Sequence, residues 1–253
     1  RIEFNPPQLT MIQKETHMNK KVTEELLSLT QDERFEIIER HKKNGVLIPM
    51  NDGVFIGKNV ELEKGAVVLQ NSVLTGQTSV KGGAVIGPGT VLFDTCVKKN
   101  ASLNFVQAFE SEIGEEADIG PFVHIRPNSH IAARVHLGNF VEVKNSTVGE
   151  ETSVSHLTYV GDSDVGRNVN FGCGCVTVNF SGKEKFRTTV GDHAFIGCNT
   201  NLVAPVNVGA YGYTAAGSTI TQDVPENALA IARARQENKE NWVLKKKPYR
   251  GME

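Results

Sequence analysis

Residues 113–143 read IGEEADIGPFVHIRPNSHIAARVHLGNFVEV, and this stretch decides the fold. An aliphatic residue recurs at every sixth position, from Ile113 to Val143. A helix repeats about every 3.6 residues and a strand about every two, so neither element alone produces such a step. The step is typical of a solenoid in which each hexad supplies a short strand and a turn. Three hexads would close one triangular coil, and successive coils would stack about 4.8 Å apart.

The same step extends on both sides of this stretch, with several resets of the frame. Glycine often follows the inward residue directly, as in Ile56-Gly57 and Ile196-Gly197. We therefore predict an all-β chain of parallel strands in which residues 53–222 form one β-helix. The expected inward positions are Ile56, Leu62, Val68, Leu74, Val80, Ile86, Leu92, Val97, Leu103, Phe109, Ile113, Ile119, Ile125, Ile131, Leu137, Val143, Val148, Val154, Val160, Val165, Phe171, Thr177, Val190, Ile196, Leu202, Val208, Thr214 and Ile220.

The composition of the 253 residues agrees with such a coil, because only 7% are aromatic and 24 are glycine. The formal net charge is −2, which argues against a broad nucleic-acid-binding surface. No apolar run approaches the length of a membrane span, and residues 1–21 lack the pattern of an export signal. We expect a cytoplasmic protein with no membrane or nucleic-acid partner. The four cysteines include no C-x-x-C pair, so we expect reduced thiols and no metal site.

The segments outside the repeat have other patterns. We expect residues 1–22 to be a flexible extension or an expression remnant, and residues 23–52 to be a helical linker. In that linker Thr30 and Glu33 form a capping box, and Gly45 stands where a helix would end. Residues 178–189 break the repeat and are polar and basic, which predicts a protruding loop. Residues 223–253 are expected to form an irregular tail that caps the last coil.

Two cations depart from the pattern of a plain scaffold. Arg126 follows the inward Ile125, and Lys144 lies 18 residues further on, which is one full coil. We expect the two to stack one above the other, an arrangement that a bound anion such as a phosphate makes favourable. Tyr159 belongs to the coil below. His156 lies close in frame to the cations and is the candidate base for an amine that attacks beside the phosphate.

The remaining histidines do not predict a metal site within one chain. His124, His130 and His136 are six residues apart, which would point them towards three different faces of one coil. A zinc site would then need histidines from two subunits.

Four motifs carry a resemblance to a known family. They are GNFVEVK at residues 138–144, HLTYVGD at 156–162, NVNFG at 168–172 and PENALAIAR at 225–233. They resemble the acetyltransferase half of the bifunctional N-acetylglucosamine-1-phosphate uridyltransferase/glucosamine-1-phosphate N-acetyltransferase family, over roughly Asp32 to Trp242. The resemblance implies a left-handed parallel β-helix and a homotrimer with sites between neighbouring subunits.

The resemblance also implies an activity and its site. The chain would transfer an acetyl group from acetyl-CoA to glucosamine 1-phosphate, a step in UDP-N-acetylglucosamine synthesis, with no metal in the transfer. His156 looks like the general base. The expected substrate contacts are Arg126, Lys144, Tyr159, Asn170 and Lys185. The expected cofactor contacts are Cys173, Asn179, Phe180, Cys198, Ala216 and Arg233. The resemblance does not extend to the family's uridyltransferase domain, so we expect either that the chain is part of a longer protein or that it works beside a separate uridyltransferase.

The sequence departs from the family pattern in ways that keep alternatives open. Phe180 and Ser181 stand where the family usually has Tyr and Asp, which puts the identity of the amine acceptor in doubt. Cys173 and Cys198 replace an alanine and a serine, either as small fillers or as a thiol acetyl carrier. The alternatives are a hexapeptide acetyltransferase for another amino sugar, a non-catalytic scaffold, and a zinc enzyme of the β-helix carbonic anhydrase type.

Overall fold

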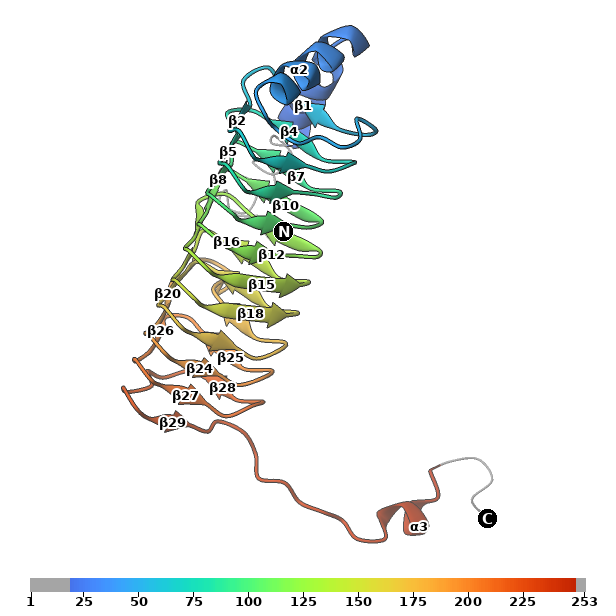
Figure 1. Cartoon of the computed structure of the whole chain (residues 1–253). Coiled ribbons are helices and arrows are strands. Elements are labelled where there is room, and N and C mark those ends of the chain that lie inside the picture. The colour runs from blue at the N-terminus through green and yellow to red at the C-terminus, as the bar shows by residue number, and fades with distance from the viewer. Residues whose placement is uncertain (1–18, 249–253) are drawn as a thin grey trace.

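Three parallel sheets form the sides of a triangular prism in the computed structural model, which describes residues 19–248 (Figure 1). We name them sheets A, B and C. The chain visits them in turn, so each strand from β1 to β25 pairs with the strand three places later, and β27 pairs with β29. In Figure 1 the strands of sheet A run from left to right across the near side while the chain descends, which makes the coil left-handed. The expected left-handed parallel β-helix is confirmed.

The strands are two to four residues long. Sheet A contains β3 (Val67–Val68), β6 (Val85–Ile86), β9 (Ser102–Leu103), β12 (Asp118–Ile119), β15 (His136–Asn139), β18 (Ser153–His156), β21 (Asn170–Phe171), β24 (Phe195–Ile196), β27 (Tyr213–Thr214) and β29 (Leu229–Ala230). Sheet B contains β1 (Phe55–Ile56), β4 (Val73–Thr75), β7 (Val91–Phe93), β10 (Val106–Phe109), β13 (Val123–Ile125), β16 (Glu142–Lys144), β19 (Tyr159–Gly161), β22 (Val176–Val178), β25 (Asn201–Val203) and β28 (Thr219–Ile220). Sheet C contains β2 (Glu61–Leu62), β5 (Ser79–Val80), β8 (Cys96–Val97), β11 (Ser111–Ile113), β14 (Ser129–Ile131), β17 (Thr147–Val148), β20 (Ser163–Val165), β23 (Thr188–Val190) and β26 (Val206–Val208).

The repeat residues fill the interior of the prism. Ile125, Val143 and Val160 are paired across neighbouring strands of sheet B, and none of the three is exposed. Each inward side chain therefore packs on the equivalent residue of the next coil, which removes it from water on all sides. One expected inward position is wrong. At the step that we assigned to Phe109, Ala108 points inward and pairs with Ile125, because the frame there is one residue shorter.

Phe109 lies on the outside of the coil instead, where the N-terminal helical segment covers it. Phe109 packs with Phe93 and Val22 in a small second apolar cluster. Residues 19–28 are helical, so the helix already includes Val22, which we had placed in a flexible extension. The helical pattern that we expected from Thr23 onwards is also interrupted. A second helix, α2 (Gln31–Lys43), begins after Thr30, whose side chain forms the expected capping box with Glu33.

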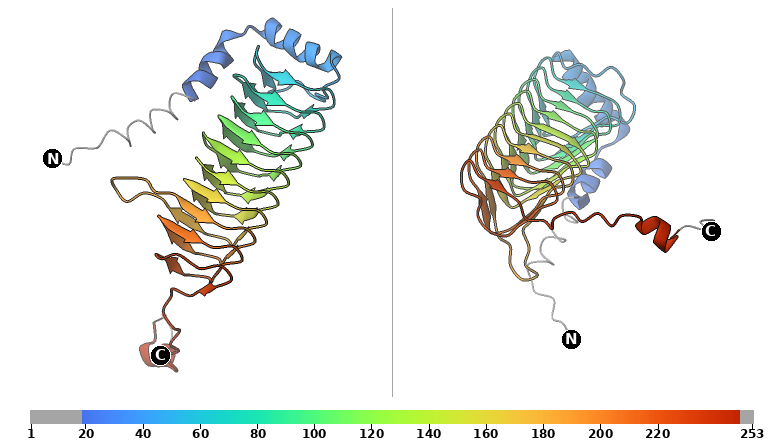
Figure 2. Two further views of the ribbon diagram at one scale, coloured as in Figure 1. Left: turned by 90° about the vertical axis from the view of Figure 1, so that its left-hand side faces the viewer. Right: turned by 90° about the horizontal axis from the view of Figure 1, so that it is seen from below.

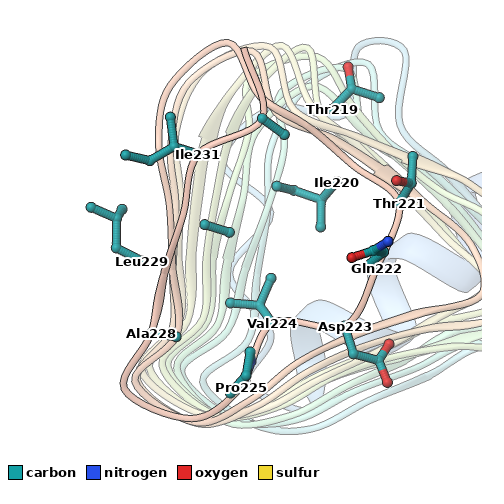
Figure 3. Close-up of a pocket in the computed structure, with 12 residues that line it drawn as sticks. Thr219, Ile220, Thr221, Gln222, Asp223, Val224, Pro225, Ala228, Leu229 and Ile231 are labelled. Carbon is teal, nitrogen blue, oxygen red and sulfur yellow. The ribbon is translucent and has the colours of Figure 1, made fainter.

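The two other departures from the repeat differ in shape. Residues 179–187 leave the coil between β22 and β23 as the expected protruding loop, visible on the left of Figure 2. At the C-terminal end, Val224 is buried against the last coil and β29 pairs with β27, so residues 224–230 still cover part of that coil. After β29, the tail runs away from the prism to the short helix α3 (Trp242–Lys246), and its residues are exposed. Figure 3 shows the open end of the last coil, where Ile220 and Val224 line a pocket.

No helix within residues 19–248 is both long enough and apolar enough to cross a membrane.

Candidate active site

The turn from sheet B to sheet C, here called the B–C corner, carries the stacked cations. Arg126 and Lys144 directly follow Ile125 and Val143, which are paired residues of β13 and β16. The 18-residue spacing therefore places the guanidinium and the ammonium on neighbouring coils, as expected. The side chain of Lys144 is only 6% exposed. A buried cation is costly unless it is paired, so its partners determine what this corner can bind.

Each of the two cations has a carboxylate partner. Lys144 Nζ lies 3.2 Å from Asp162 Oδ2, and Arg126 Nη1 lies 2.8 Å from Glu142 Oε1. Asp162 also accepts hydrogen bonds from the side-chain amides of Asn145, at 2.5 Å, and Asn179. Burial raises the pKa of Asp162, but the hydrogen bond from Asn145 and the charge of Lys144 outweigh it, so the pKa is lowered. The carboxylate stays ionised and holds the ammonium in place.

The protruding loop brings a third cation to the B–C corner. Partial burial, the neighbouring Lys144 and, to a smaller extent, Arg126 lower the pKa of Lys185 to about 8, although the charge of Asp162 acts in the opposite direction. Lys185 is paired with Phe180, which follows Asn179, and the Asn179 amide is bonded to Asp162, so the loop carries Lys185 to this corner although it lies far from Arg126 in sequence. Three predicted substrate contacts, Arg126, Lys144 and Lys185, are therefore together. The carboxylate of Asp162 offsets part of the repulsion among these cations. The group still carries excess positive charge, which is suited to binding a doubly charged anion.

Tyr159 lies beside this group of cations because the residue two positions further on, Gly161, has no side chain. Gly161 pairs with Lys144 and so occupies the next position below the two cations. A Cβ on Gly161 would lie only 2.3 Å from the Tyr159 hydroxyl, so the ring occupies the space that a side chain would fill. The hydroxyl accepts a hydrogen bond of 3.4 Å from Asn179. The phenol is thereby fixed at the edge of the cation group.

His156 lies at the other edge of the same face. It ends β18 in sheet A, at the turn that we call the A–B corner, and it is exposed. Its Nδ1 lies 2.8 Å from Asn139 Oδ1, in the coil above. Because an amide oxygen only accepts hydrogen bonds, Nδ1 carries the proton and Nε2 keeps a free lone pair. The neutral ring is thus oriented as a base.

Sheet B separates His156 from the cation group. Six residues separate His156 from Asp162, so their backbones are at most about 20 Å apart. The outward side chains of β16 and β19 cross this interval, with Glu142 and Tyr159 paired as neighbours. Both corners border this face. The side chains of Lys144 and Arg126 are long, so the distance from their charged groups to the His156 ring is shorter than the distance between the backbones. The face of sheet B between the corners is the candidate substrate site.

Most of the predicted cofactor contacts follow His156 down the A–B corner in a single column. The pairs Val154–Phe171, Phe171–Ile196 and Ile196–Thr214 fix the register of four coils. Two residues after each of these positions come His156, Cys173, Cys198 and Ala216. Arg233 joins this column from the following coil, where its Nη1 donates to Ala216 O at 3.0 Å. At about 4.8 Å per coil, the column offers a narrow strip that leads away from the base.

The structure does not bring all the predicted contacts together. Asn170 projects from β21 on sheet A, a different face from that of Tyr159. Asn179 and Phe180 lie at the base of the loop on the B–C corner, apart from the other four cofactor contacts. Asn179 is buried and bonded to Asp162 and Tyr159, which places it with the predicted substrate contacts. Within one chain the predicted site is therefore spread over two faces.

Four residues of this arrangement were not identified as site residues from the sequence. Asp162 and Asn145 hold the cations, Glu142 pairs with Arg126, and Asn139 orients His156. One signal was available, because Asp162 lies 18 residues after Lys144, the spacing of one coil. The same rule applied to His156 leads to residue 138, one position away from Asn139, because the frame shortens by one between these coils.

The three evenly spaced histidines lie on three sheets, as expected. His124 is in β13 of sheet B, His130 in β14 of sheet C and His136 in β15 of sheet A. Within the part of the chain that the structure describes, no group of three or more His, Cys, Asp or Glu residues could hold a metal ion.

The chain is similar in sequence to known proteins. No family model matches the chain. The bifunctional protein GlmU of Clostridium acetobutylicum is 49% identical over 210 residues, which are 83% of this chain and 46% of that protein. The bifunctional protein GlmU of Geobacillus sp. is 50% identical over 210 residues, again 83% of this chain and 46% of that protein. The chain therefore spans about half the length of the relatives that it matches.

Solved structures share the coil with lower similarity. LpxA from Acinetobacter baumannii has a TM-score of 0.42 and 18% identity, and the match covers 68% of this chain and 71% of that chain. The GDP-perosamine N-acetyl transferase from Caulobacter crescentus has a TM-score of 0.37 and 21% identity, with 46% and 53% covered. The extended sequence identity shows that the chain is homologous to the C-terminal part of the bifunctional GlmU proteins.

Proposed function

We propose that the chain transfers an acetyl group from acetyl-CoA to the amine of glucosamine 1-phosphate. The observation that supports this most strongly is the pairing of an anion-binding corner with an oriented base across one face of the prism. Arg126, Lys144 and Lys185 supply positive charge at one edge, and His156 is held by Asn139 at the other. The proposed reaction is acetyl transfer alone, without uridyl transfer.

Each group has a role in the proposed reaction. The cations bind the 1-phosphate, and Tyr159 and Glu142 line the face on which the sugar lies. The free Nε2 of His156 removes a proton from the amine as the nitrogen attacks the thioester carbon. The C–N bond forms, the C–S bond breaks, and coenzyme A leaves as a thiol. Asn139 keeps the imidazole in the tautomer that can accept this proton.

The column at the A–B corner is the proposed path of the cofactor. The acetyl thioester lies beside His156, and the rest of coenzyme A follows Cys173, Cys198 and Ala216 towards Arg233. The Arg233 guanidinium is positive and exposed, which suits a phosphate of the coenzyme. We assign no covalent role to the thiols in the transfer.

A homotrimer is part of the proposal because one chain leaves Asn170 and Asn179 on different faces. Flat-sided prisms that associate about a three-fold axis place sheet A of one copy against a neighbouring copy. Asn170 of one subunit would then complete the site on sheet B of its neighbour. Such a wall would also supply the concavity that a flat face lacks.

The test is the rate of coenzyme A release with acetyl-CoA and glucosamine 1-phosphate. His156→Ala should lower kcat by a factor of about 100 to 10,000, the usual contribution of a general base. His136→Ala is the matched control, since His136 is also a histidine of sheet A with its Nδ1 bonded, at 3.1 Å to Asp118. Equal rates in wild type and His156→Ala would remove His156 from the mechanism.

A further inference from the structure

Two cysteine thiols lie next to each other on the A–B corner. Cys173 and Cys198 each follow a paired residue of β21 and β24 by two positions, and Asn199 N donates to Cys173 O at 2.8 Å. They therefore occupy equivalent places on neighbouring coils, with Cα atoms about 4.8 Å apart. This separation lies within the range found in disulfides, about 4.4–6.8 Å.

The glycine before Cys173 leaves room for the second sulfur. A Cβ on Gly172 would lie 2.8 Å from Sγ of Cys198, so this sulfur lies over Gly172, directly beside Cys173. Any larger residue at position 172 would displace it. The side chain of Cys198 thus lies over the backbone that leads into Cys173.

The thiol of Cys175 lies near this pair but is buried, unlike the other two. Cys175 is buried, its Sγ donates to Gly197 O at 3.1 Å, and burial raises its pKa to about 11. Because the thiolate is the reactive form, Cys175 is a poor nucleophile at neutral pH. Cys198 is exposed and Cys173 is half-buried, so oxidants reach both. Cys96 lies on sheet C in β8, on another side of the prism.

We propose that Cys173 and Cys198 form a redox-active pair that closes to a disulfide under peroxide. One thiolate attacks a peroxide oxygen, the O–O bond breaks, and a sulfenic acid forms with loss of water. The second thiol then attacks that sulfur, the S–S bond forms, and a second water leaves. Two thiols are oxidised and one hydrogen peroxide is reduced to two waters. A thiol reductant reverses the step.

The disulfide would lie on the column that we assign to coenzyme A, one coil below His156. Joining the two sulfurs draws the side chains together across this strip and removes the surface that the cofactor arm would contact. This consequence for coenzyme A rests on the proposed function, whereas the formation of the disulfide does not. Oxidation is therefore expected to weaken coenzyme A binding by about tenfold or more, about 1.4 kcal/mol.

The experiment is disulfide mapping of the full chain after treatment with hydrogen peroxide and alkylation of the remaining thiols. Trypsin releases residues 168–183, with Cys173 and Cys175, and residues 188–233, with Cys198. We expect these two peptides to be linked in wild type and in the control variant Cys96→Ser. The link should persist in Cys175→Ser and disappear in Cys173→Ser.

Fragmentation of the linked wild-type peptides assigns the bond without any variant, should one fail to fold. A bond to Cys175, or full oxidation of the thiols without a link, would overturn the proposal. Calorimetry with coenzyme A tests the consequence separately, since oxidised protein should bind it weakly and reduced protein should recover. Unchanged binding by the disulfide form would contradict the blocking role. No binding by the reduced protein would count against the proposed function instead, and the mapped disulfide would stand.

Discussion

The side chain of Lys185 connects the charge of the anion site to pH. Its pKa, lowered to about 8 by burial and by Lys144, means that it is charged below pH 8 and neutral above. Charge on Lys185 favours a bound phosphate, so affinity should fall as the pH rises through this value. We predict that KM for glucosamine 1-phosphate rises severalfold between about pH 7 and pH 9.

Lys185→Arg tests this, because a guanidinium stays charged over the whole range. The variant should show a flatter KM profile. Lys183→Arg makes the same exchange in the same loop, at a lysine to which the account gives no role in the site, and is the control. If the wild-type KM were constant across this range, the ionisation of Lys185 would not control binding.

Asn139 is the residue that sets the tautomer of His156, and its chemistry can be changed with little change in shape. Asn139→Asp places a carboxylate 2.8 Å from Nδ1, the distance of the present hydrogen bond. A negative charge there stabilises the protonated ring relative to the neutral one. We predict that the acidic limb of the kcat–pH profile moves to higher pH. Asn139→Leu removes the hydrogen bond without adding a charge, so it should lower kcat by about tenfold and leave the acidic limb of the profile at the same pH. A shift of this limb in both variants would contradict the role of Asn139 as the partner of His156.

At the scale of the elements, the pair Lys144 and Asp162 joins the end of β16 to the turn after β19. Both side chains are almost fully buried, at 6% and 7% exposed. Removing one partner leaves a buried charge without compensation, whereas removing both does not. We predict that Asp162→Leu lowers the free energy of unfolding by about 3–5 kcal/mol and that Lys144→Met combined with Asp162→Leu restores most of it. Urea denaturation of the two single variants and the double variant measures this coupling, and additive losses would argue against a buried pair.

The elements show how far the sequence determines the fold. The six-residue step predicts nearly every inward residue because a solenoid repeats one environment, so that one pattern fixes the register of all its coils. The exceptions occur where this environment changes. The repeat is one residue shorter at one step, so Ala108 points inward in place of Phe109. Phe109 then lies on the outside of the coil, where the helix at residues 19–28 covers it. Nothing local in the sequence shows that contact.

The candidate site was partly predictable for the same reason. Arg126 and Lys144 are 18 residues apart, which is one full coil, so the spacing alone predicts that they stack. Lys185 joins them through a loop, and its position next to Lys144 depends on how residues 179–187 fold back. Likewise, the resemblance implied that Asn179 contacts the cofactor, but its amide is bonded to Asp162 at the B–C corner. Spacing predicts contacts along the coil, and it does not predict contacts made by loops.

At the scale of the whole molecule, the account requires a site shared between copies, because Asn170 lies on sheet A, whereas Tyr159 and Glu142 of the candidate substrate site lie on sheet B. His156→Ala and Asn170→Ala should each be poorly active alone. If the two residues act across an interface, a trimer assembled from both variants contains an interface with both native side chains. We predict that mixing after denaturation and refolding restores part of the coenzyme A release. Mixed samples no more active than the separate variants would place both residues in the same subunit's site.

The central claim is that the cations at the B–C corner bind the phosphate of an amino sugar whose amine His156 deprotonates. The most direct measurement compares the initial rate of coenzyme A release with glucosamine 1-phosphate and with glucosamine. The account predicts a kcat/KM at least about 100-fold higher for the phosphate ester, and a loss of most of this preference in Arg126→Ala through KM. Equal rates with both sugars, or an unchanged preference in Arg126→Ala, would contradict it.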